Sequence, residues 1–163
     1  MRNPFSMVID FSAAWLPRKS AAYLCLYVAW LVTLWFLSAG NPGPKEGPEI
    51  PHLDKIAHFG YFFGGGGLLT GYLALRRPWT SRFPWRVFLC VVLVGTVVGR
   101  LDEYHQTFTP GRTGNDNYDW LADILGTLVG FWVMIRWVLP RLMARKKRSS
   151  EALEAEIVAN TLD

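Results

Sequence analysis

The chain has 163 residues, of which 51% are hydrophobic, and it carries a formal net charge of +4. This length suits a single domain. Long apolar runs alternate with short breaks that are charged or rich in proline and glycine, and this pattern argues against an ordinary soluble protein.

Four stretches are apolar enough to cross a bilayer as helices, which takes about 20 residues each. The first stretch contains no charged residue, and the second contains a histidine and a run of glycines. The third spans the bilayer if it continues through Arg100, and the fourth contains Asp123 and Arg136. We therefore predict an all-α fold, a polytopic four-helix membrane bundle over residues 21–140, with helices at residues 21–39, 56–75, 87–107 and 120–139.

Basic residues are concentrated in alternate segments: before the first helix, between the second and third, and after the fourth. By the positive-inside rule, residues 1–20, the loop at 76–86 and the tail at 141–163 are cytoplasmic, and the loops at 40–54 and 107–118 lie outside. We therefore expect a multi-pass inner-membrane protein with both termini in the cytoplasm. Nucleic acid is not an expected partner, because the positive charge follows the membrane flanks.

The C-terminal tail is basic first and then acidic. Its basic run at 145–148 is expected to attract anionic lipid on the cytoplasmic side. The remainder is expected either to form a short helix or to stay disordered. At the other end of the chain, an uncleaved anchor is favoured over a cleaved signal for the first helix, because its apolar run is long.

Three polar residues fall at a similar depth in this bundle. Counted from the cytoplasmic arginine on the same helix at 1.5 Å per residue, His58 and Asp123 lie about 27 Å up, and Glu103 about 25 Å up. Arg100 lies a turn deeper, at about 21 Å. The hydrocarbon core is about 30 Å thick, so these groups lie just inside its outer boundary. Intramembrane charges face the bundle interior or one another, whereas snorkelling to the surface suits short acids poorly.

On the third and fourth helices, the carboxylates lie on the same helix face as a pair of glycines spaced four residues apart. Glu103 and Gln106 share a face with one Gly-x-x-x-Gly pair, with Asp102 at its edge, and Asp119 and Asp123 share a face with another. This spacing lets helix backbones approach closely. We predict close packing at Gly95, Gly99, Gly126 and Gly130, and a polar chamber inside the bundle that opens to the outside.

Three segments carry a likeness to a known family. They are Asp54-Lys55-Ile-Ala-His58-Phe on the second helix, Asp102-Glu103-Tyr-His-Gln106 with Pro110-Gly111-Arg112 after the third, and Asp119-Trp-Leu-Ala-Asp123 on the fourth. In this order they resemble the VanZ-like family of integral membrane proteins, over about residues 25–135. The family pattern has Asn in place of Asp123 and often Ser in place of Asp102. The resemblance implies that the characteristic polar residues of this chain are Asp54, Lys55, His58, Glu103, Gln106, Arg112 and Asp119.

The resemblance also implies a link to resistance against the lipoglycopeptide teicoplanin. Our first hypothesis is that the chamber binds or translocates an envelope lipid or amphiphile, such as a lipid-linked cell-wall precursor or a lipoglycopeptide. Lys55, Arg100 and Arg112 would grip phosphate, and Arg112 is expected to fold over the chamber mouth toward Glu103. The proposed binding residues are Asp54, Lys55, His58, Arg100, Asp102, Glu103, Gln106, Arg112, Asp119 and Asp123.

Two further hypotheses stay open. In the second, the protein is a membrane-embedded hydrolase or transferase for lipid-linked substrates, with His58 as a general base or metal ligand and Glu103 as a general acid or base. No cofactor is firmly implied, although a divalent metal could be held by Glu103, Asp119 and Asp123. In the third, the charges pair only to hold a structural scaffold together. The sequence does not decide between enzyme and binding protein, and it gives no oligomeric state.

Overall fold

The computed structural model describes residues 16–40, 52–76, 83–112 and 114–162, and among these the regular elements are all helices, with no strand. Helix α2 comprises Ser20–Ser38, α3 Leu53–Leu75 and α4 Trp85–Gln106. Helix α5, Asn117–Val133, passes through the π-helical turn η1, Met134–Val138, into α6, Leu139–Leu162. The expectation of an all-α chain is confirmed, and the bounds of the four predicted helices match α2, α3, α4 and α5 with η1 to within a few residues.

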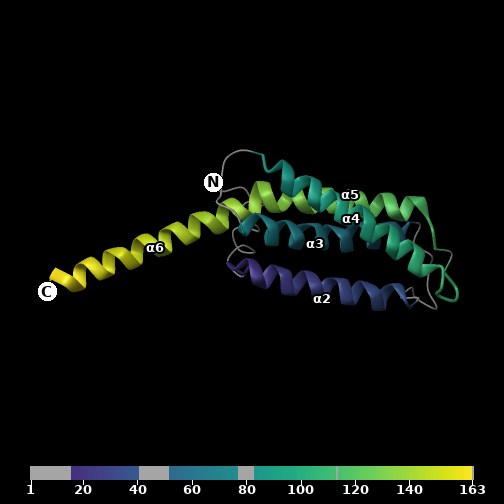
Figure 1. Ribbon diagram of the computed structural model, residues 1–163, viewed down its shortest axis with the longest axis horizontal. Coiled ribbons are helices and arrows are strands. Elements are labelled where there is room, and N and C mark those ends of the chain that lie inside the picture. Colours follow the sequence, from purple (N-terminus) through teal and green to yellow (C-terminus); the bar gives the residue numbers. More distant parts are fainter. Residues whose placement is uncertain (1–15, 41–51, 77–82, 113, 163) are drawn as a thin grey trace.

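Helices α2 to α5 lie side by side as a bundle, and α6 projects from it (Figure 1). The most extensive interface is between α3 and α5. We call the end that holds Ser38, Leu53, Gln106 and Asn117 the polar end, and the opposite end, where α6 leaves, the basic end. All three segments that carry the family likeness reach the polar end, so the fold brings them together.

Glycines explain why α3 and α5 pack so closely. A Cβ atom added at Gly126 or Gly130 would collide with the backbone oxygens of Phe59 or Phe63. On the facing helix, a Cβ at Gly66 would lie 2.8 Å from the Thr127 Cα. The two backbones therefore touch, as Gly-x-x-x-Gly spacing predicts.

The other predicted glycine pair, on α4, also packs against α5. A Cβ at Gly95 would lie 2.5 Å from Thr127 Cγ2, and one at Gly99 would lie 2.9 Å from Asp123 Cβ. At these two glycines the close contact is with side chains of α5 and not with the α5 backbone. The position of Asp123 inside the bundle thus depends on the absence of a side chain at residue 99.

The outside of the bundle is apolar. Large hydrophobic side chains are exposed on every helix of the bundle, for example Phe36 on α2, Ile56 on α3, Leu93 on α4 and Leu125 on α5. Two helical runs, Ser20–Ser38 and Asn117–Ala152, are long and apolar enough to cross a membrane. The interior holds apolar clusters and, at one end, buried carboxylates, which are rare in the core of a soluble protein.

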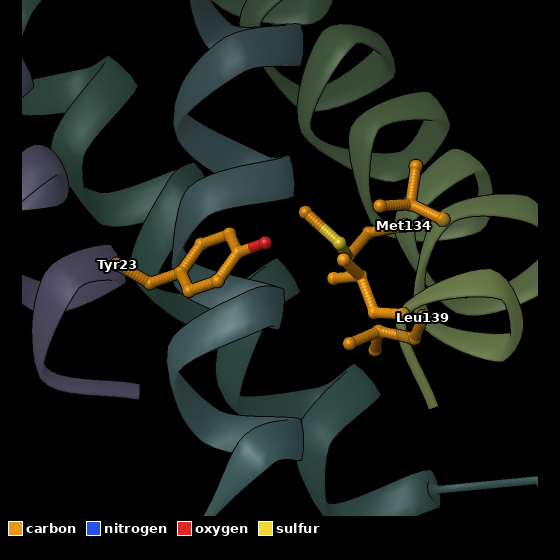
Figure 2. Close-up of a cluster of buried hydrophobic side chains, with 5 residues drawn as sticks. Tyr23, Met134 and Leu139 are labelled. Atoms are coloured by element: carbon orange, nitrogen blue, oxygen red, sulfur yellow. The ribbon is translucent and has the colours of Figure 1, made fainter. Parts of the chain in front are cut away.

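At the basic end, α2 is held to η1 and α6 by an apolar cluster. Tyr23 packs with Met134, Val138, Leu139 and Leu142, and its hydroxyl points toward Met134 (Figure 2). This cluster lies at the far end of the bundle from the polar residues, so it stabilises the bundle without contributing to the site.

The π turn has a local cause in the sequence. Pro140 has no backbone N–H, and its ring would clash with the carbonyl four residues earlier in a regular helix. The Leu139 N–H instead bonds to the Met134 oxygen, five residues back. The helix therefore continues past residue 140, and of the two expectations for the tail the helical one is confirmed, in a longer form.

Candidate polar site

His58 is the centre of the buried polar cluster. Its Nδ1 lies 3.0 Å from Asp123 Oδ1, and its Nε2 lies 3.8 Å from Glu103 Oε1. Glu103 and Asp123 are 0% exposed and His58 is 8% exposed. These side chains come from α3, α4 and α5, and their contacts place them at one level along the bundle, as expected.

Glu103 ties α4 to the start of α5. Its Oε2 accepts a 2.7 Å hydrogen bond from the Asp116 N–H, and its backbone oxygen accepts one from Asn115 at 3.2 Å. The turn between the helices uses the left-handed region at Gly114, with φ of 58°, and at Asn115, with φ of 53°. This geometry points the turn's N–H groups at Glu103, while Glu103 Oε1 stays buried without a hydrogen-bond partner.

Asp102, expected at the edge of the stripe, is also buried. Its Oδ2 accepts a 2.7 Å hydrogen bond from Gln106 Nε2, one turn further along α4. Ser38 on α2 donates to the Asp102 backbone oxygen at 3.4 Å. Helix α2 therefore covers the flank of α4, which explains why two adjacent acids, Asp102 and Glu103, are both inside.

Lys55 forms a second polar cluster nearer the helix ends. Its Nζ lies 2.9 Å from Asp54, 3.2 Å from Asp116 and 3.0 Å from Asp119. An ammonium has three N–H donors, and three carboxylates meet them here. This arrangement does not match the prediction that Lys55 grips phosphate, because the neighbouring acids already neutralise it.

Asp116 caps helix α5, as its sequence position predicts. Its side chain accepts a 2.7 Å hydrogen bond from the Tyr118 N–H. This bond, together with the Lys55 ammonium, holds the pKa of Asp116 below its usual range. The carboxylate is therefore charged, which suits both the cap and the ion pair.

The two arginines assigned to the chamber lie elsewhere. Arg100 is exposed, and its guanidinium lies 5.7 Å from the centre of the Trp120 ring. The residue follows Gly99 by one position, which turns it about 100° away from the buried stripe. The prediction that Arg100 faces the chamber is therefore wrong.

Arg112 follows the expected Pro-Gly turn but contacts a different group. Its Nη1 donates to the Gly40 oxygen at 3.3 Å, at the end of α2. The turn docks there because Thr109 Oγ1 donates to the Ser38 oxygen at 2.9 Å. Arg112 thus closes the polar end between α2 and α4, and the expected Arg112–Glu103 ion pair is absent from the described structure.

Sequence reasoning missed the residues that join α2 to this end. His105 Nδ1 lies 3.1 Å from Ser38 Oγ, and its ring stacks on Trp35 with centroids 3.9 Å apart. Thr109, described above, belongs to the same contact. A single hydroxyl at the end of an apolar run gives no periodic signal, so these partners could not be identified before the helices were placed.

The sequence profile of the VanZ/LLP1 family matches residues 4–139. The chain belongs to this family. Comparisons with curated proteins and with solved structures find no match. Family membership and the two long apolar helices together indicate a membrane protein.

Within the described parts of this VanZ/LLP1 chain, two groups of three side chains each bring one potential metal-ligand atom per residue within 4.8 Å of one another. One is His58, Asp102 and Glu103, and the other is Asp54, Asp116 and Asp119. The set expected to hold a metal, Glu103, Asp119 and Asp123, is thus divided, with Glu103 and Asp119 in different groups. The helix crossing puts His58 rather than Asp119 next to Glu103.

Proposed function

We propose that this VanZ/LLP1 protein crosses the membrane four times with both termini in the cytoplasm, so that its polar end lies at the outer boundary. Basic residues at the opposite end support this orientation, since Arg76 follows α3, Arg86 lies in the first turn of α4, and Arg141 lies at the start of α6. Exposed apolar side chains on all four helices match a lipid environment.

We further propose that the polar end binds the headgroup of an envelope amphiphile. The observation that carries this is a pair of buried carboxylate oxygens, Glu103 Oε1 and Asp123 Oδ2, that have no hydrogen-bond partner. Leaving a buried acceptor unpaired costs about 1–3 kcal/mol, and more when it is charged. A ligand with hydroxyl or amine donors would satisfy both oxygens.

The surroundings fit an amphiphile rather than a soluble solute. Arg112 lies on the rim of the same end as the carboxylates. Arginine binds phosphate through a planar fork, and Trp120 next to Arg100 suits the membrane interface. We therefore propose a ligand with a sugar or amine part near the carboxylates and an anionic part near Arg112. A lipid-linked cell-wall precursor and the lipoglycopeptide teicoplanin both meet this description.

The test is a binding measurement on the full-length protein in detergent, with a fluorescent lipid-linked disaccharide–pentapeptide precursor and with teicoplanin as probes. Glu103→Gln should weaken binding about tenfold or more, because a bond from a donor to a charged acceptor contributes about 1.5–3 kcal/mol. Arg112→Lys keeps the charge but loses the fork, and should weaken binding of the phosphate-bearing precursor.

Glu151→Gln is the matched control, since Glu151 is an exposed glutamate on α6, far from the polar end. It should bind like the wild type. If Glu103→Gln and Glu151→Gln bind equally well, or if the wild type binds neither probe more tightly than phosphatidylglycerol, the binding proposal fails.

One observation favours a second candidate, a membrane-embedded hydrolase or transferase. The Nδ1 side of His58 is held by Asp123, so Nε2, which lies 3.8 Å from Glu103 Oε1, is the nitrogen that would act as a general base. Turnover of the lipid-linked precursor, followed by mass spectrometry, should then be lost in His58→Gln while binding persists. Binding without turnover in the wild type would leave the binding function alone.

A further inference from the structure

We propose that His58, Asp102 and Glu103 bind one divalent metal ion of the zinc type. Their potential ligand atoms, one from each residue, all lie within 4.8 Å of one another, and all three residues are buried. The set differs from the acidic set expected from the sequence, because His58 and Asp102 take the places of Asp119 and Asp123. It assigns to a metal ion the oxygen, Glu103 Oε1, that the binding proposal assigns to a ligand donor, and it is tested separately because the metal is measured with no lipid present.

The distances require little movement. Ligand atoms around a tetrahedral zinc ion, each about 2.1 Å from it, lie about 3.4 Å apart. His58 Nε2 and Glu103 Oε1 are already 3.8 Å apart. Small side-chain rotations would bring them to bonding distance.

An unpartnered atom points into this group. Glu103 is 0% exposed, and its Oε1 has no hydrogen-bond partner, although it faces His58 Nε2. A buried carboxylate oxygen without a donor is costly unless a cation or a proton meets it. A metal ion between Oε1 and Nε2 would provide that contact.

Each proposed ligand is oriented by a second hydrogen bond, as metal ligands are. His58 is held through Nδ1 by Asp123, at 3.0 Å. Glu103 is held through Oε2 by the Asp116 N–H, and Asp102 through Oδ2 by Gln106, both at 2.7 Å. Nε2 of His58 and Oε1 of Glu103 remain for the ion, and three protein ligands would leave a coordination position open.

The charge balance also favours a cation. Asp102, Glu103 and Asp123 are buried together, and within the described parts of the chain the ion pairs of Glu103 and Asp123 are both with His58. Several acids inside a membrane bundle need compensation. The other acidic group already holds the Lys55 ammonium among its carboxylates, so it has no comparable need for a metal ion.

The experiment uses the full-length protein in detergent, first stripped with EDTA and then given Zn²⁺. After gel filtration, mass spectrometry should find about one zinc per chain in the wild type. Asp102→Asn and Glu103→Gln should each lower the affinity for Zn²⁺ by tenfold or more. Asp54→Asn, which alters the other acidic group, and Glu151→Gln on α6 should bind zinc like the wild type.

A second measurement guards against variants that fail to fold. X-ray absorption at the zinc edge of the wild type should show one imidazole and otherwise oxygen ligands. The proposal is overturned if the wild type retains no zinc, if the spectrum shows no imidazole, or if Asp54→Asn loses zinc while folded Asp102→Asn keeps it. These outcomes are read without any lipid ligand, so they are separate from failure of the binding function.

Discussion

Nδ1 of His58 lies 3.0 Å from Oδ1 of Asp123, and this contact joins α3 to α5 inside the bundle. Gly99 makes room for it, since a Cβ there would lie 2.9 Å from Asp123 Cβ. The contact therefore depends on three helices, with α4 contributing only the absence of a side chain.

This contact predicts different effects for two substitutions of Asp123. Asp123→Asn retains an oxygen acceptor for His58 and should change the free energy of unfolding by about 1 kcal/mol or less. Asp123→Leu leaves the buried imidazole without its partner and adds bulk against Gly99, so it should cost about 3 kcal/mol or more. Unfolding in detergent, followed by circular dichroism, measures both. Equal stability of the two variants would show that the hydrogen bond contributes little.

Glycine packing predicts that a large side chain destabilises the bundle where α5 touches the α3 backbone, and not on an open face of α3. Gly126→Leu and Gly130→Leu would force α5 away from the α3 backbone at Phe59 and Phe63, and we expect losses of about 3 kcal/mol or more in stability. Gly64→Leu is the matched control, because a Cβ there meets nothing within 4 Å. The measurement is the midpoint of thermal unfolding in detergent. A Gly64→Leu variant that melts as early as Gly126→Leu would contradict the close-approach interpretation.

The Lys55 cluster predicts a charge-dependent loss of stability. Lys55→Met removes the cation shared by Asp54, Asp116 and Asp119, and leaves their like charges close together. We expect a loss of about 1–3 kcal/mol, in the lower half of that range because Asp54 is half exposed. A double variant, Lys55→Met with Asp119→Asn, should recover part of it. No recovery would mean that Lys55 acts through packing rather than charge.

The proposed topology predicts which positions a membrane-impermeant thiol reagent reaches. In a variant lacking Cys25 and Cys90, a cysteine at Pro48 or Asn115 should be labelled in intact cells, because both positions are proposed to lie outside. A cysteine at Asn3 or Ser150 should be labelled only after the membrane is opened. The reverse pattern would place the polar end in the cytoplasm and exclude an outward-facing site.

The sequence by itself determined which residues share a depth and a face. The rise of 1.5 Å per residue and the helical period depend only on backbone geometry, so they place His58, Glu103 and Asp123 at one level before any packing is known. The same periodicity identified the glycine stripes at Gly95, Gly99, Gly126 and Gly130, all of which are buried. The polar motifs also indicated the family, which the profile match to VanZ/LLP1 confirms.

Only the tertiary structure decided which partner each polar group has. Lys55, Arg100 and Arg112 were expected at one chamber, but they contact three carboxylates, an indole ring and a backbone oxygen respectively. Long basic side chains reach over several ångströms, and their partners depend on how the helices cross and on where residues 107–112 lie. Helical periodicity tells which residues share a face of one helix, but not how two helices are rotated relative to each other. The group formed by His58, Asp102 and Glu103 depends on the relative rotation of α3 and α4. The packing of the whole bundle sets that rotation.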